Sequence, residues 1–289
     1  MDSTRGSIFM VLAMAAFAVE DMFIKAAAQT VPIGLTLMLF GLGGMLIFML
    51  LTWQRGEQII HPAFCSRPLF IRACCEVVGR LFFALAITLT PLSSASAILQ
   101  ATPLVVVVGA ALFFGEKVGA GRWLAVLLGF AGVMMIVRPG LDGFNPASWF
   151  AVISTLGFAG RDLATRAAPA LLSNVQLGVY GFFVLIPSGL ILHLYYAESV
   201  VMNAQVGGFV LGAVLFGVLA YNSLTIAMRS GDVSVVAPFR YTRLLFALIL
   251  GMIIFSERPD MLTLIGGLIV VLSGGYTLMQ SRRQLRARS

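Results

Sequence analysis

The chain alternates between long apolar blocks and short polar breaks along its 289 residues. Each block is about twenty residues long, which is the length that an α-helix needs to cross the hydrocarbon core of a bilayer. Pro103, Pro187 and Pro238 fall inside blocks, where we expect them to kink the helix. The pattern predicts an all-α membrane protein with ten transmembrane helices, near residues 6–28, 32–52, 70–89, 93–114, 121–138, 148–168, 174–196, 206–228, 234–255 and 261–280.

The composition excludes a soluble globular domain. Hydrophobic residues make up 60% of the chain, charged residues only 11%, and the mean hydropathy is +0.99. Three cysteines without metal-ligand spacing and two histidines far apart offer no metal site and no disulfide framework. We therefore expect no metal and no cofactor, and the lipid bilayer as the main partner.

The net charge of +7 indicates membrane topology, because the basic residues gather at the ends of apolar blocks and in the tail. This distribution argues against nucleic acid as a partner. With a cytoplasmic N-terminus, the outer side keeps only Arg138 and Arg258. The inner side then collects Arg5, Arg55, Arg67, Arg72, Lys117, Arg122, Arg166, Arg229, Arg282, Arg283, Arg286 and Arg288. We therefore predict a multi-pass protein of the bacterial inner membrane with both termini in the cytoplasm.

The two halves of the chain are similar when one is shifted by 141 residues against the other. We predict two five-helix repeats, 1–140 and 141–280, followed by a basic cytoplasmic tail, 281–289. Because five is an odd number of spans, the second repeat must enter the membrane from the opposite face, as in many secondary transporters. The aligned pairs are Ser7 with Ser148, Phe17 with Phe158, Asp21 with Asp162, Lys25 with Arg166, Ala26-Ala27 with Ala167-Ala168, Ala86 with Ala227, Ser93 with Ser234, and Glu116 with Glu257.

Short fourth-to-fifth connections with an acidic residue, at residues 114–117 and 255–258, accompany proline-bearing fourth and ninth helices. With the ten-helix, two-half pattern, these features resemble the drug/metabolite transporter superfamily, and more narrowly its EamA-type exporters, over nearly the whole chain. The resemblance implies a central cavity lined by helices 1, 3, 4, 6, 8 and 9, with helices 5 and 10 outside it. It is closest in appearance to bacterial amino acid exporters, although the superfamily also moves nucleotide sugars, sugar phosphates and drugs.

Charged residues inside the predicted spans indicate a polar interior. Each would cost roughly 2.5–3.5 kcal/mol facing lipid at mid-depth, so most must face protein or water. Three pairs are four residues apart and can be satisfied within one helix: Asp21 with Lys25, Glu76 with Arg80, and Asp162 with Arg166. The charged residues in spans are Glu20, Asp21, Lys25, Glu76, Arg80, Arg161, Asp162, Arg166, Arg240 and Arg243.

Glu20 and Arg161 occupy equivalent positions in the two repeats and carry opposite charges. A pseudo-two-fold axis between their helices would set them facing, so that they hold the halves together in one state; the alternative is two unrelated cavity charges. With Asp21 and Asp162, they form the predicted gating or coupling set.

Arg240 and Arg243 are three residues apart on a helix that Pro238 kinks, so we expect one of them to bind a substrate carboxylate. In the alternative, Glu20 and Glu76 neutralise both arginines in a structural cluster. The remaining predicted substrate-binding residues are Glu76, Arg80, Gln100, Tyr221, Asn222 and Tyr241.

The sequence favours a secondary active transporter that exports a small zwitterionic or anionic metabolite, above all amino acids, by alternating access. A proton-coupled exporter of cationic drugs that uses Glu20 is the alternative; the surplus of positive charge in the spans opposes it. No metalloprotease or serine-hydrolase motif is present, so we expect no enzyme activity. A channel would not need an inverted repeat with charges at its centre, and a substrate-accumulation assay separates the two, because only a transporter moves solute uphill.

The predicted orientation can be tested by cysteine labelling in intact cells. Single cysteines at Ser3, Ser66 and Ser289 should resist a membrane-impermeant reagent, because all three positions are predicted to face the cytoplasm. Labelling of any one of them in sealed cells would overturn the orientation.

Overall fold

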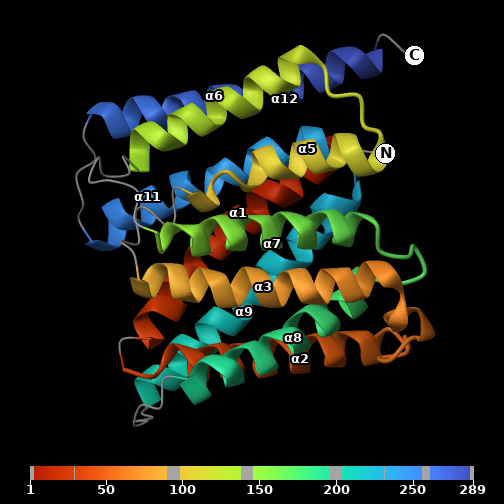
Figure 1. Ribbon diagram of the computed structural model, residues 1–289, viewed down its shortest axis with the longest axis vertical. Helices are drawn as coiled ribbons and strands as arrows, with labels where there is room; N and C mark the ends of the chain where they lie inside the picture. The colour runs from red at the N-terminus through yellow and green to blue at the C-terminus, as the bar shows by residue number, and fades with distance from the viewer. Residues whose placement is uncertain are drawn as a thin grey trace.

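The computed structural model describes residues 3–28, 30–89, 98–137, 146–195, 204–230, 232–255 and 261–286. The regular secondary structure of these residues consists of helices, and the long helices lie side by side in one bundle (Figure 1). The elements are α1 (Ser3–Ala27), α2 (Ile33–Gln54), η1 (Pro62–Cys65), α3 (Arg67–Leu89), α5 (Thr102–Phe114), α6 (Ala120–Val137), α7 (Ser148–Arg166), α8 (Asn174–Tyr195), α9 (Ala204–Ser230), α10 (Val233–Val236), η2 (Ala237–Tyr241), α11 (Thr242–Phe255) and α12 (Met261–Arg286).

These helices follow the predicted apolar blocks. Among the described residues, α1, α2, α8 and α9 are long and apolar enough to cross a membrane by length and composition. Helix α3 is as long but carries Arg67, Arg72, Glu76 and Arg80, which lower its hydropathy. Residues 93–97 of the predicted fourth block lie outside the described residues, and Pro103 stands in the first turn of α5 rather than inside it. Helix α12 continues past residue 280 into the predicted tail.

The bundle is built from four helix pairs. Helix α1 packs on α9, α3 on α7, α2 on α8, and α6 on α12. Figure 1 shows α6 and α12 along one edge of the bundle and α2 and α8 along the opposite edge. The start of α1 and the end of α12 lie on the same side of the bundle (Figure 1), as an even number of crossings requires.

Glycines allow the paired helices to approach closely. A β-carbon added at Gly157 of α7 would lie 2.6 Å from the backbone nitrogen of Gly79 in α3. Likewise, one added at Gly189 of α8 would lie 2.6 Å from the carbonyl oxygen of Gly34 in α2. Without a strong hydrophobic drive between helices in lipid, such contacts between small residues contribute much of the packing energy.

The predicted ninth helix is broken into α10, the 3₁₀ segment η2 and α11. Pro238 stands in the first turn of η2, where it cannot donate an α-helical hydrogen bond. The Glu116 carboxylate, from the α5–α6 connection, accepts hydrogen bonds from the backbone N–H groups of Val233 (2.9 Å) and Ser234 (3.0 Å). A side chain from the first half of the sequence therefore caps the start of the broken helix in the second half.

The close helix contact can be tested with a glycine pair. Gly157→Ala should lower the thermal unfolding midpoint in detergent, because the added methyl meets backbone and overpacking costs about 1–3 kcal/mol. Gly208→Ala in α9 is the matched control: nothing lies within 4 Å of its added β-carbon, and alanine favours a helix by up to about 1 kcal/mol. Equal midpoints for the two variants would contradict the tight α3–α7 contact.

Candidate functional site

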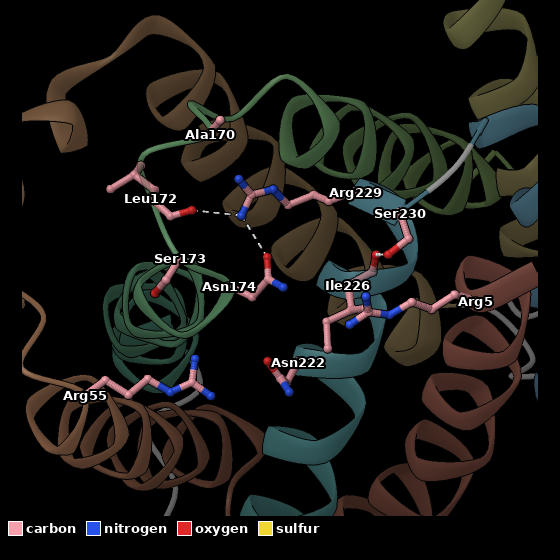
Figure 2. A pocket seen from close by; sticks show the side chains of 10 residues that line it. All are labelled: Arg5, Arg55, Ala170, Leu172, Ser173, Asn174, Asn222, Ile226, Arg229 and Ser230. Carbon is pink, nitrogen blue, oxygen red and sulfur yellow. Dashed lines mark hydrogen bonds between the residues drawn. The ribbon is translucent and has the colours of Figure 1, made fainter. Parts of the chain in front are cut away.

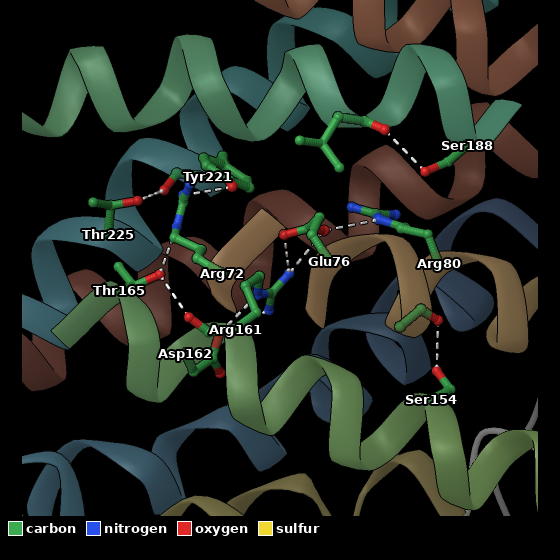
Figure 3. A network of polar contacts seen from close by, with 12 residues as sticks. Arg72, Glu76, Arg80, Ser154, Arg161, Asp162, Thr165, Ser188, Tyr221 and Thr225 are labelled. Atoms are coloured by element: carbon green, nitrogen blue, oxygen red, sulfur yellow. Dashed lines mark hydrogen bonds and ion pairs between the residues drawn. The ribbon is translucent and has the colours of Figure 1, made fainter. Parts of the chain in front are cut away.

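A network of charged and polar side chains connects α3, α7 and α9 inside the bundle (Figure 3). Arg161 of α7 is at its centre, with Nη1 3.3 Å from Glu76 Oε1 and Nη2 2.9 Å from Asp162 Oδ1. Its guanidinium carbon lies 5.0 Å from the centre of the Phe158 ring. The side chains of Arg161, Glu76 and Asp162 are all buried. Their pairing offsets the large desolvation cost that each charge would carry if it were buried without a partner.

Helix α3 presents three charged residues to this network, one turn apart. Arg80 Nε lies 3.3 Å from Glu76 Oε1, which confirms the predicted pair within one helix. Arg72, one turn before Glu76, donates to Thr165 Oγ1 at 2.9 Å and to the Tyr221 hydroxyl at 2.6 Å. Arg72 is absent from the predicted site because its position near the start of the helix suggested a topological role.

The repeat-equivalent aspartates Asp21 and Asp162 both pair with the broken ninth helix. Asp162 of α7 pairs with Arg240 of η2, and Asp21 of α1 pairs with Arg243 of α11, whose Nε is 2.9 Å from Asp21 Oδ2. For Asp162, this contact replaces the expected pair with Arg166 of its own helix. The other expected pair, Asp21 with Lys25, involves a side chain that lies outside the described residues.

The same contacts bear on Arg240 and Arg243. Each guanidinium is engaged by an aspartate in this conformation, and the binding of a substrate carboxylate by one of them stays a prediction. Their partners are not Glu20 and Glu76, as the structural alternative required, but the two aspartates. The tertiary contact of η2 and α11 with α1 and α7 brings these groups together, which spacing along one helix cannot reveal.

The predicted contact between Glu20 and Arg161 is not formed in this conformation. Arg161 is occupied by Glu76 and Asp162. Glu20 is 1% exposed, and its Oε2 atom has no hydrogen-bond partner in the part of the chain that the structure describes. The repeat symmetry that placed both at matching depth does not place them against each other.

The other predicted residues fall in four places. Tyr221 joins the network through Arg72, and Asn222, next to it, lines a separate cavity. Gln100 lies in the turn before α5 and is half-buried. Tyr241 is fully buried against α6 and α12, where its hydroxyl is 3.3 Å from the carbonyl oxygen of Val126. The structure therefore does not bring Tyr241 to the charged network.

A cavity of about 580 Å³ opens between the start of α1, the end of α2, the α7–α8 connection and the end of α9 (Figure 2). Arg229 is held at its wall by the Leu172 carbonyl oxygen at 2.9 Å and Asn174 Oδ1 at 2.7 Å. The lining residues are Arg5, Arg55, Ala170, Leu172, Ser173, Asn174, Asn222, Ile226, Arg229 and Ser230. Three are arginines and none is acidic, so the cavity favours an anionic group. Among the described residues, no group of three metal-ligating side chains is found.

A bundle of apolar helices with a buried charged network and a polar cavity defines a membrane transporter of small molecules. The chain belongs to the EamA-like transporter family, whose pattern matches it twice, over residues 4–138 and 145–278. This result confirms the resemblance to EamA-type exporters of the drug/metabolite transporter superfamily.

Several relatives are transporters with different substrates. The chain is 30% identical over 201 residues to a riboflavin transporter of Vibrio cholerae, covering 69% of this chain and 67% of that protein. It is 26% identical over 272 residues to a pseudopaline exporter of Pseudomonas aeruginosa, covering 93% and 94%. An S-adenosylmethionine uptake transporter of Rickettsia felis is 27% identical over 221 residues, covering 71% and 70%. The chain spans about two thirds of the length of the riboflavin transporters it matches.

A solved crystal structure with 17% sequence identity has the same fold, with a TM-score of 0.83 over 97% of this chain and 99% of that chain. Together, the comparisons establish a multi-pass membrane transporter of a small metabolite. The relatives differ in substrate and in the direction of transport, so neither follows from family membership alone.

A double-mutant cycle can test the centre of the network. Arg161→Gln with Glu76→Gln should show a coupling free energy of at least about 1 kcal/mol in detergent unfolding, because the two groups are in contact and buried. The matched cycle of Arg161→Gln with Glu20→Gln should show coupling below about 0.5 kcal/mol. A larger coupling free energy for Arg161 with Glu20 than for Arg161 with Glu76 would instead support the predicted Glu20–Arg161 pair.

Proposed function

We propose that this protein is a secondary active transporter that exports a small carboxylate-bearing metabolite, above all amino acids, across the bacterial inner membrane. The excess of arginine around the polar interior carries the proposal. In the charged cluster, four acidic residues, Glu20, Asp21, Glu76 and Asp162, face five arginines. Those arginines are Arg72, Arg80, Arg161, Arg240 and Arg243.

The cavity at the end of α9 adds three more arginines without an acid. A carboxylate entering there would meet Arg229 with its guanidinium already oriented by Leu172 and Asn174. Fixed guanidinium groups bind carboxylates bidentately, and little conformational entropy is lost when the donor is held in place. A cationic drug would meet only repulsion at this cavity, which weighs against the alternative function.

We further propose that the two halves are inverted repeats that move by alternating access. In such an arrangement, the first helix of each half would pack on the third helix of the other half, which pairs α1 with α9 and α7 with α3. The second helices, α2 and α8, and the fifth helices, α6 and α12, would pair across the axis. The observed helix pairs follow this rule. The repeat-equivalent aspartates Asp21 and Asp162 would then hold the ninth helix from the first helix of each half in this state.

Vesicles containing the purified protein test the substrate class. We expect unlabelled amino acids to compete for uptake of a labelled one, with a subset of the twenty competing strongly, at both pH 6 and pH 8. Arg229→Gln should reduce uptake at least tenfold at low substrate concentration, whereas Arg55→Gln, which removes an exposed side chain, should have a smaller effect. Accumulation of a cationic dye driven by a pH gradient, with no competition by amino acids, would favour the drug exporter instead.

A further inference from the structure

An ion pair between two helices in one half of the bundle has no counterpart between the equivalent helices of the other half. In one half, Arg161 of α7 pairs with Glu76 of α3 at 3.3 Å. Shifting by 141 residues maps Arg161 to Glu20 and Glu76 to Gly217. The equivalent helices, α1 and α9, are packed together as α3 and α7 are. Where one half has an ion pair, the other therefore has a carboxylate opposite a glycine.

Glu20 is in contact with this glycine. A β-carbon added at Gly217 would lie 3.5 Å from the carboxyl carbon of Glu20, and it would also meet the ring of Phe40 from α2. The carboxyl group thus approaches the bare backbone of this glycine, and among the described residues its buried Oε2 atom has no hydrogen-bond partner. A buried acceptor left in this state costs free energy that a bound donor would recover.

The charged groups around Glu20 come from three helices. Arg80 and Glu76 are on α3, Arg243 is on α11, and Asp21 is the next residue of α1. Asp21 already engages Arg243 through two nitrogens, and Arg161 and Arg80 share Glu76. Among the described side chains, no ion pair reaches Glu20.

Arg80 has unused donors. Only its Nε donates to Glu76, and its two terminal nitrogens have no hydrogen-bond partner among the described residues. Its side chain is 17% exposed, whereas that of Glu76 is 2% exposed. A carboxyl group without a donor and a guanidinium with free donors thus lie in one charged cluster.

We propose that Glu20 binds the ammonium group and Arg80 the carboxylate of an α-amino acid; this proposal rests on the proposed function. The guanidinium end of Arg80 can take a carboxylate in two parallel hydrogen bonds. The Glu20 carboxylate can accept hydrogen bonds from an ammonium group and offset its charge. Gly217 has no side chain and so supplies no competing cation. The ammonium group of the substrate would therefore be the ion-pair partner that Glu20 lacks on α9.

Three ligands with the same side chain separate the two roles: an α-amino acid that the wild type binds, its 2-hydroxy acid, which lacks the ammonium group, and its decarboxylated amine. Affinities are measured by calorimetry on the purified protein. Glu20→Gln should weaken the amino acid and the amine at least tenfold and leave the hydroxy acid unchanged. Arg80→Gln should weaken the amino acid and the hydroxy acid at least tenfold and leave the amine unchanged.

Asp232→Asn is the matched control, because it removes a half-exposed carboxylate outside the cluster, 3.6 Å from Arg122, and should change none of the three affinities. If Glu20→Gln does not fold, Glu20→Asp keeps the charge but withdraws it, and should show the same selective loss for the amino acid and the amine.

Equal losses for all three ligands, or none, would overturn the proposal. So would a Glu20→Gln variant that loses only the pH dependence of transport, since Glu20 would then carry a proton. A wild type that binds none of the three would instead remove the proposed function itself.

Discussion

The structure depends on keeping ionised side chains inside a bundle whose surroundings are apolar. An isolated buried charge is expensive, and the cost falls only when opposite charges and hydrogen bonds surround it. Arg161 meets this constraint by bridging Glu76 of another helix and Asp162 of its own. The close approach of α3 and α7 through Gly79 and Gly157 follows from the same need, because a wider separation would leave the bridge incomplete.

Much of the fold could be predicted because hydrophobic block length, proline position and a constant repeat offset are properties of the sequence alone. The break at Pro238 is one example: the missing N–H of proline predicts a disrupted helix, and the structure has a 3₁₀ segment there. Helix ends were less accessible. Helix α12 runs to Arg286, since basic residues are good helix formers even where hydropathy has ended.

The sequence predicted which residues belong to the charged network better than it predicted which side chains pair with each other. The cost of burial in lipid selects Glu76, Arg80, Arg161 and Asp162 as interior residues, and the structure places them in one network. Which arginine meets which acid depends on how helices are rotated against one another, and this information is not in the spacing along one helix. For this reason, Asp21 and Asp162 were matched within their own helices, whereas they pair with Arg243 and Arg240.

The Glu116 cap has a mechanical consequence. Its carboxylate accepts two backbone hydrogen bonds from α10, and Arg122 of α6 donates to the Ser234 hydroxyl at 2.8 Å. The corner between α5 and α6 and the start of the broken helix are thereby joined at three points. We therefore expect α10 and the α5–α6 connection to move together as one rigid unit. Bending of the ninth helix would then take place in η2, which follows α10 directly.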